Sequence, residues 1–332
     1  MQLKPKFFLF IPILLAFGIT LTGTLLHGFS GVDIYFHLDI ARAFSQGDFI
    51  GGFKVAYAMN YTFYPPLFQL ILAVGFLFGN SELWAKFLQV IFLPLAVGSF
   101  MFLVYKLRGV TASFYGGLLV LGSLAYLDRV IQAQPHAIDF ILLPWVFYFF
   151  LRGNKLGYVL SSVLMVWNHG LVSISAIGGS LLLLLKQRNY KWFAAWLSGS
   201  LVIITISFYY IVSGLQNYGG RVDTDQEYLF WHSATFIPEY LGLLTVGFAV
   251  AIYFVYRYVK HLELSAVSKL SLLTIATTAV MIPMWADRWL QYITIPLALL
   301  ILEQAHVSSK RVQLLLKATI ILAVAVVLLE LF

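Results

Sequence analysis

Apolar residues fill most of the chain in long blocks, and short polar segments separate these blocks. An apolar run of about 20 residues is long enough to cross a bilayer as a helix. The pattern predicts about eleven membrane-spanning helices, namely Phe7–His27, Leu83–Leu107, Thr111–Leu127, His136–Leu151, Leu156–Trp167, Leu171–Leu185, Trp192–Ser213, Ile237–Tyr258, Ala266–Trp285, Trp289–Glu303 and Val312–Leu331. Pro66–Phe78 is also apolar but too short to span comfortably, so we expect an interfacial or re-entrant helix there.

The composition supports a protein whose solvent is largely lipid. Of the 332 residues, 61% are hydrophobic and 11% are charged, whereas about a quarter of the residues in soluble domains are charged. No polar stretch is long enough to form a separate soluble domain. We therefore predict a single all-α integral-membrane domain over residues 1–332, a polytopic helix bundle with long outer loops at 28–82 and 214–237. The first of these loops carries the interfacial helices.

The basic residues indicate how the helices are threaded. With the N-terminus in the cytoplasm, most of the 21 Lys and Arg residues fall at cytoplasmic helix ends, which is the bias that sets orientation in membrane proteins. This bias accounts for the net charge of +7 without a nucleic-acid partner. Most of the 14 acidic residues fall on the opposite side. We therefore expect an extracytoplasmic active site, and we place the protein in the plasma membrane of a prokaryote rather than in the endoplasmic reticulum.

The segment GVDIYFHLDIARAFSQGDF follows the first predicted span and holds three aspartates and a histidine. In a helix, Asp33 and His37 lie one turn apart on the same face. The histidine can then donate a hydrogen bond to the carboxylate or share a metal ion with it. The simpler interpretation is that Asp33 caps the start of an interfacial helix. This segment alone leaves both interpretations open.

A second acidic segment, LDRVIQAQPHAIDF, contains Asp128 and Asp139. Asp139 falls at or just inside the start of a predicted span, where an ionised carboxylate costs about 2.5–3.5 kcal/mol. Such a residue normally faces the bundle interior and has a partner, for which Arg129 and His136 are the nearest candidates. The alternative to a functional role is a structural pair of Asp139 with Arg129.

Two further segments place polar residues between predicted spans. Arg288 follows Asp287 in MWADRWLQYITIP; its guanidinium could bind an anionic ligand or extend to the lipid headgroups. In VWNHGLV, Asn168 and Gly170 predict a turn that leaves His169 near the outer surface. A turn does not require a histidine, so a ligand-binding role for His169 stays open.

Taken together, these segments resemble the GT-C superfamily of polytopic glycosyltransferases, which includes oligosaccharyltransferase catalytic subunits, protein O-mannosyltransferases and lipid A aminoarabinose transferases. The stretch DIYFH is similar to the D-x-Y-Y-H of oligosaccharyltransferases, and FYPPLFQ looks like the PPL segment of the other two branches. WNHGLV falls where related enzymes have a T-K-G or T-H-P turn, and ADRWLQYITIPLALLI is similar to their R-[YF]-L-x-x-x-x-P-L-A-L-L element. Neither a W-W-D-Y-G motif nor a C-terminal soluble domain is present, so sequon-directed transfer is not expected.

The resemblance implies an inverting glycosyltransferase that moves a sugar from a polyprenyl- or dolichyl-phosphate donor to a lipid, glycan or protein acceptor. Asp33 would be the general base, and Asp139 or Asp128 would orient the acceptor. Tyr64 stands where relatives often carry a Lys or His beside the lipid phosphate, so most of the charge that binds this phosphate must come from elsewhere. The candidate residues for binding the substrate or its lipid phosphate are Arg288, His37, His169, Arg129 and Tyr64.

A metal ion and two other functions also follow as hypotheses. Asp33, His37 and Asp139 could hold Mg²⁺ or Mn²⁺, although none is required, because arginine can stabilise the departing phosphate. A transporter or lipid flippase is the main alternative, but such proteins often have internal repeats, which we do not detect. A non-catalytic scaffold that binds prenyl-linked sugars or partner proteins is the third hypothesis.

Overall fold

The structure is a computed structural model, and it describes residues 5–29, 33–49, 51–52, 55, 66–202, 246–260, 263–307 and 310–331. Within these ranges all regular secondary structure is helical, as predicted. The α-helices are α1 (Phe10–His27), α2 (Asp33–Ser45), α4 (Leu67–Leu77), α5 (Ser81–Leu121), α6 (Leu124–Val130), α7 (Pro135–Leu151), α8 (Lys155–His169), α9 (Leu171–Lys186), α11 (Ala266–Thr278), α12 (Ile282–Val307) and α13 (Lys310–Leu331). Residues 190–202 and 246–259 are also helical, and 3₁₀ turns cover Pro5–Leu9 and Ala279–Met281.

The helix α5 is divided at Gly109 into two halves that fold back on each other. Gly109 has φ 83° and ψ −171°, a conformation that is essentially restricted to glycine. After this point the Ser113 hydroxyl donates a 2.7 Å hydrogen bond to the carbonyl oxygen of Met101. The sequence predicted two spans that separate near this glycine, and the break is confirmed. The second half ends at Leu121, and the short helix α6 follows it.

Polar and glycine residues set the ends of α7, α8 and α9. Pro135 stands in the first turn of α7, where its missing N–H leaves no hydrogen bond unmade. The Asn154 side chain caps α8 by accepting a hydrogen bond of 2.9 Å from the backbone N–H of Gly157. Gly170, with φ 53°, then ends α8 and allows α9 to begin at Leu171. The predicted turn at Gly170 is therefore present.

The break before α12 lies at a different place from the predicted one. The sequence pattern put the break between two spans at Asp287–Arg288. Instead α11 ends at Thr278, and α12 starts at Ile282 and runs unbroken to Val307. Pro283 explains this start, because proline is favoured in the first turn of a helix. Asp287 and Arg288 consequently lie inside α12.

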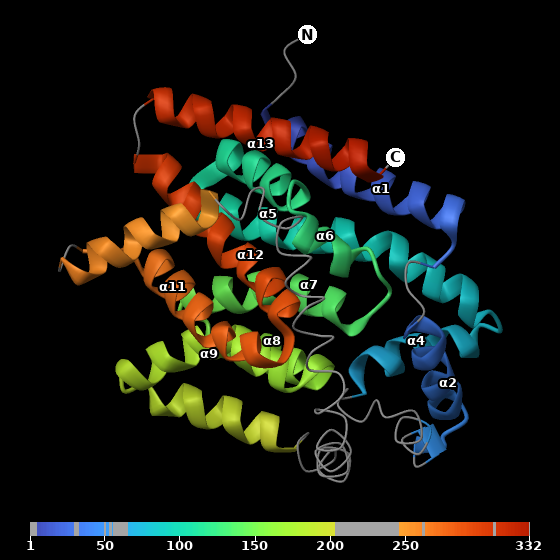
Figure 1. Ribbon diagram of the computed structural model, residues 1–332. Helices are drawn as coiled ribbons and strands as arrows, with labels where there is room; N and C mark the ends of the chain where they lie inside the picture. The colour runs from blue at the N-terminus through green and yellow to red at the C-terminus, as the bar shows by residue number, and fades with distance from the viewer. Residues whose placement is uncertain are drawn as a thin grey trace.

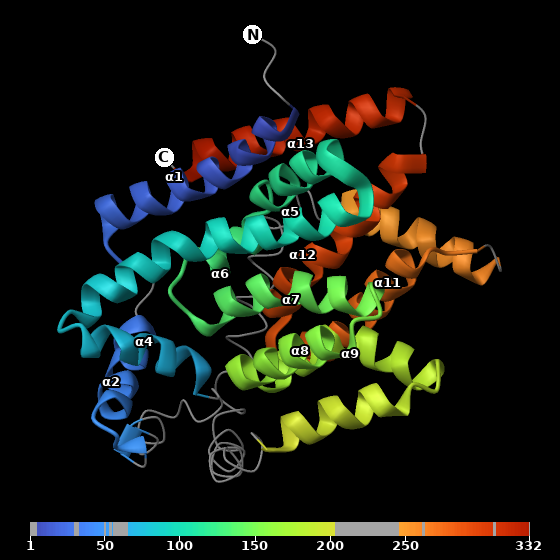
Figure 2. The ribbon, with the colours of Figure 1, turned by 180° about the vertical axis from the view of Figure 1, so that it is seen from behind.

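The helices form one bundle around a shared apolar core (Figures 1 and 2). Both α1 and α13 pack along α5, and α2 packs on α4 beside the start of α5. On the other side of α5, α7 packs on α8, and α9 packs on α11, which in turn packs on α12. The α9–α11 contact is close, because a Cβ atom on Gly179 would come within 2.5 Å of the Thr274 backbone nitrogen. Small residues of this kind allow membrane helices to approach closely.

Two of the described helices, Phe7–His27 and Ser81–Leu121, are long and apolar enough to cross a membrane by length and composition. Several shorter described helices are also strongly apolar, among them Leu67–Leu77 at the predicted interfacial segment. The total number of spans and the single-domain boundaries stay predictions. The second predicted outer loop, residues 214–237, lies outside the described residues.

Candidate functional site

Asp139, at the start of α7, is fully buried and accepts several hydrogen bonds. Its Oδ1 accepts from the Asn168 side-chain amide at 2.8 Å. Its Oδ2 accepts from the Ser173 hydroxyl at 2.9 Å and from the Tyr292 hydroxyl at 2.6 Å. The Asn168 amide also donates to the carbonyl oxygen of Pro135. Both carboxylate oxygens are therefore satisfied by protein donors from α8, α9 and α12, as a buried charged group requires.

The Tyr292 hydroxyl connects Asp139 to two histidines. His136 Nδ1 lies 3.2 Å from this hydroxyl, and His169 Nδ1 lies 3.3 Å from it. The single hydroxyl proton is directed at Asp139, so the imidazole nitrogens must be the donors to the tyrosine oxygen. His169 Nδ1 is also 3.4 Å from Asp139 Oδ2. These hydrogen bonds therefore place a proton on Nδ1 of each imidazole ring.

These six residues, which we call the Asp139 cluster, come from four helices. They are His136 and Asp139 of α7, Asn168 and His169 of α8, Ser173 of α9 and Tyr292 of α12. The rings of His136 and His169 are 4.1 Å apart and nearly perpendicular. The Phe140 ring stacks on the Tyr292 ring at 4.9 Å and forms an apolar wall beside the cluster.

The first-loop helix α2 brings a third histidine to this end of the bundle. His37 is 2% exposed, and its ring packs edge-on against Phe68 of α4 at 5.0 Å. Gln69 Nε2 lies 3.0 Å from His37 Nδ1; an amide nitrogen can only donate, so this imidazole nitrogen is the acceptor. Burial is the larger cause and the neighbouring His169 the smaller one, and together they lower the pKa of His37 to about 3. His37 is therefore neutral at physiological pH.

The structure brings three predicted site residues together and leaves others undescribed. Asp139, His169 and His37 gather at one end of the bundle. His169 is buried rather than near the surface, because its ring turns inward to Tyr292 and Asp139. The side chains of Asp33, Asp128, Arg129, Asp287 and Arg288, and all of Tyr64, lie outside the described part of the structure.

Four polar residues of this region were not predicted as site residues. Tyr292 and Ser173 lie inside long apolar runs, where nothing in the local pattern distinguishes them from core residues. Asn168 was assigned only to a turn, although its side chain contacts Asp139. Gln69 is the residue that the sequence could have indicated most clearly. It is a glutamine in the apolar run LFQLILAVGFL, and a buried glutamine requires a hydrogen-bond partner.

Among the described residues, no group of three or more His, Asp or Glu could hold a metal ion, and the predicted Mg²⁺ or Mn²⁺ stays a prediction. His136 and His169 contact Tyr292 through their Nδ1 atoms, and both oxygens of Asp139 are engaged by hydrogen bonds. Of the predicted set of Asp33, His37 and Asp139, the Asp33 side chain lies outside the described part of the structure.

The fold is similar to that of a known crystal structure, ArnT from Cupriavidus metallidurans bound to undecaprenyl phosphate. The TM-score is 0.55 at 17% sequence identity, and the match covers 91% of this chain and 60% of the ArnT chain. ArnT is a GT-C aminoarabinose transferase. The chain has a GT-C-like fold. The predicted resemblance and the predicted all-α membrane bundle are thus confirmed.

The GT-C-like fold is that of an integral membrane protein, as the composition predicted. The chain spans about 60% of the length of ArnT. No protein-family model matches the chain, and no curated protein sequence matches it. At 17% identity the likeness establishes the fold alone.

Proposed function

We propose that the protein is a membrane glycosyltransferase that takes a sugar from a polyprenyl-phosphate donor and transfers it to an acceptor on the extracytoplasmic face. The observation that carries the proposal is the convergence of His37, His169 and Asp139 at one end of a GT-C-like bundle. Three of the seven histidines of the chain, His136 included, meet there. The similar fold of ArnT bound to undecaprenyl phosphate supports a polyprenyl phosphate as the carrier of the sugar.

Asp33 is the proposed general base. It is the first residue of α2 and lies one helical turn before His37, which is close enough to His169 for an electrostatic interaction. In the proposed step, Asp33 takes the proton of an acceptor hydroxyl while the hydroxyl oxygen attacks the anomeric carbon. The bond between that carbon and the phosphate oxygen breaks, and the lipid phosphate leaves with the electron pair. The configuration at the anomeric carbon is inverted.

We assign Asp139 a positioning role rather than direct contact with the acceptor. Its carboxylate is fully buried and engaged by Asn168, Ser173 and Tyr292. It holds the Nδ1 side of His169, directly and through Tyr292. A histidine fixed in this way has its ring orientation and tautomer set before substrate binds, which avoids reorganisation during the reaction.

Arginine side chains are proposed to stabilise the departing phosphate. Arg288 is in the second turn of α12, one turn before Tyr292, and Arg129 is in α6. A guanidinium can bind phosphate oxygens with two parallel hydrogen bonds. His169 would assist them in this role. Mg²⁺ or Mn²⁺ could also be bound by Asp33 and neighbouring groups, and Asp128 remains the alternative acidic residue for orienting the acceptor.

The proposal is tested with the full chain reconstituted in proteoliposomes that contain membrane lipid extract as acceptor. Radiolabelled undecaprenyl-phosphate sugars serve as donors, and labelled product is separated from donor. Wild-type protein should transfer label, and Asp33→Asn should lower turnover by at least about 100-fold, since removal of a general base typically costs that much. Asp39→Asn is the matched control, because Asp39 lies in the same helix but is exposed beside Arg42.

The other hypotheses give different results in the same vesicles. A flippase would move labelled donor across the bilayer without releasing the sugar, and a scaffold would bind donor without either reaction. Full transfer by Asp33→Asn, with Asp39→Asn equally active, would remove Asp33 from the mechanism. Absence of transfer with every donor sugar, together with transport of the intact lipid, would replace the proposal with the flippase.

A further inference from the structure

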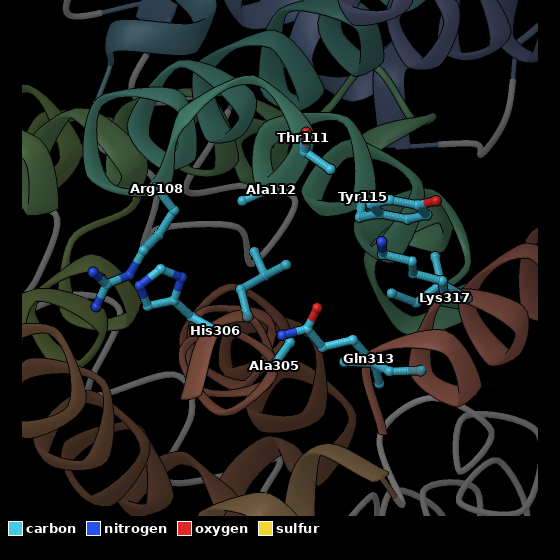
Figure 3. A pocket seen from close by; sticks show the side chains of 11 residues that line it. Arg108, Thr111, Ala112, Tyr115, Ala305, His306, Gln313 and Lys317 are labelled. Carbon is cyan, nitrogen blue, oxygen red and sulfur yellow. The ribbon is translucent and has the colours of Figure 1, made fainter. Parts of the chain in front are cut away.

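A hollow lies among α5, α12 and α13, far from the Asp139 cluster. It encloses about 660 Å³, open solvent at its mouth included. One side of the hollow is lined by residues just before and after the break at Gly109. The other side is lined by the end of α12 and the start of α13 (Figure 3). Along α12, His306 of this hollow is 14 residues from Tyr292, a separation of about 20 Å. The hollow is therefore at the C-terminal end of α12, well separated from the Asp139 cluster.

The polar side chains of this hollow are mostly cationic or hydrogen-bond donors. Figure 3 shows Arg108 and His306 at one end of it and Tyr115 and Lys317 at the other, with the Gln313 amide between them. The Lys317 ammonium lies over the Tyr115 ring, 5.1 Å from its centre. This cation–π contact holds the ammonium at the wall of the hollow.

One acid lies close to these cations. Glu303 Oε2 accepts a 3.1 Å hydrogen bond from Arg108 Nε and a shorter one from another nitrogen of the same guanidinium. Glu303 is not among the residues that line the hollow. The ion pair with Glu303 offsets the charge of Arg108. No Asp or Glu is among the described residues that line the hollow, so the charge of Lys317 is not offset there. The hollow is positive overall.

Apolar side chains form the rest of the wall, and they indicate an amphiphilic ligand rather than a hydrated ion. Leu302, Leu316 and Ile320 line the hollow. The neighbouring outer face of α13 continues with exposed Leu314 and Leu322, 69% and 66% exposed. In a membrane protein such a face contacts lipid tails. A molecule with an anionic head and acyl chains satisfies both parts of this surface.

We propose that this hollow binds the phosphate headgroup of an anionic phospholipid from the cytoplasmic leaflet. The basic residues of the helix ends around it set the predicted cytoplasmic side, and basic pockets between membrane helices on that side suit anionic headgroups. The phosphate lies beside Lys317, with the Gln313 amide as a further donor, and the acyl chains lie along α13. The site is independent of the proposed transferase chemistry.

Lipid binding is measured by native mass spectrometry of the purified full chain with added phosphatidylglycerol or phosphatidylcholine. We expect at least one retained phosphatidylglycerol with an affinity about 10-fold above that for phosphatidylcholine. Lys317→Gln should reduce this preference at least fivefold. Thr111→Phe, which fills the exposed rim of the hollow without changing charge, should do the same. Lys186→Gln is the control, since Lys186 is an exposed lysine at the end of α9 and outside the hollow.

The thermal midpoint of each variant checks that it is folded. Equal retention of both lipids by wild-type protein overturns the proposal, as does an unchanged preference in folded Lys317→Gln and Thr111→Phe. Competition by inorganic phosphate at millimolar concentration distinguishes the source of the phosphate group. If free phosphate displaces phosphatidylglycerol completely, the hollow is a site for a soluble phosphate and the lipid assignment is wrong.

Discussion

The Tyr292 hydroxyl donates a 2.6 Å hydrogen bond to Asp139, a residue 153 positions earlier in the chain. This bond joins α12 to the start of α7 in the interior of the bundle. The same hydroxyl oxygen accepts from His136 and His169. One phenol therefore determines the position of a carboxylate and of two imidazole rings.

Replacing Tyr292 with phenylalanine should weaken the bundle while preserving the ring packing on Phe140. A hydrogen bond to a charged group is worth about 1.5–3 kcal/mol, so Tyr292→Phe should lower the free energy of unfolding by about that amount in detergent. Tyr253→Phe is the matched control, because Tyr253 is 44% exposed. Equal thermal midpoints for the two variants would contradict the network described here.

His37 should make the stability depend on pH. Its pKa falls from an ordinary value of 6.5 to about 3 on folding. Between these values the unfolded chain binds a proton that the folded chain does not, so stability is lost as the pH falls from 6.5 toward 3. The loss is up to about 1.4 kcal/mol for each pH unit, and above pH 6.5 the group contributes no pH dependence.

The measurement is the free energy of unfolding at pH 7.5 and pH 5 for wild-type protein and His37→Gln. Wild-type protein should lose roughly 2 kcal/mol more than the variant over this interval. His306→Gln replaces an exposed histidine and should behave like wild-type protein. Identical pH dependence in wild-type protein and His37→Gln would show that His37 is not buried in neutral form.

The turn at Gly109 should not tolerate a side chain. A Cβ atom at this position would meet no atom within 4 Å, so the expected cost comes from the backbone conformation at φ 83°. Gly109→Ala should therefore destabilise the protein by about 1–3 kcal/mol. Gly23→Ala is the control, since Gly23 also has open space around it but lies within the helix α1. There alanine should be neutral or stabilising by up to about 1 kcal/mol; a similar loss at both sites would point to steric crowding instead.

The Arg108–Glu303 ion pair should couple the end of the first half of α5 to α12. The Glu303 side chain is 10% exposed and the Arg108 side chain 28% exposed. Arg108→Gln and Glu303→Gln should each lower the free energy of unfolding by about 1–3 kcal/mol. The double variant should lose less than the sum, with a coupling energy of about 0.5–3 kcal/mol. The control pair is Glu82 and Lys86, an exposed i, i+4 pair that should couple by less than about 0.5 kcal/mol. Additive losses at Arg108 and Glu303 would mean that the two side chains do not interact in solution.

The sequence by itself determined the all-helical bundle, the break at Gly109, the turn at Gly170 and the short helix after Pro66. These features depend on local signals, because an apolar run and a glycine or proline act within a few residues of their own position. The resemblance to the GT-C superfamily was also present in short motifs such as DIYFH. The sequence singled out Asp139 correctly as a buried carboxylate that needs a partner.

Only the tertiary structure decided which side chains are the hydrogen-bond partners of Asp139. The nearest candidates along the chain were His136 and Arg129, of which the Arg129 side chain lies outside the described part. The observed donors are Asn168, Ser173 and Tyr292 from three other helices. His136 reaches Asp139 through Tyr292. The hydropathy pattern shows which helix faces are apolar. The partners of a buried polar group depend instead on how separate helices cross, and the crossing of helices is determined by packing between segments distant in the chain.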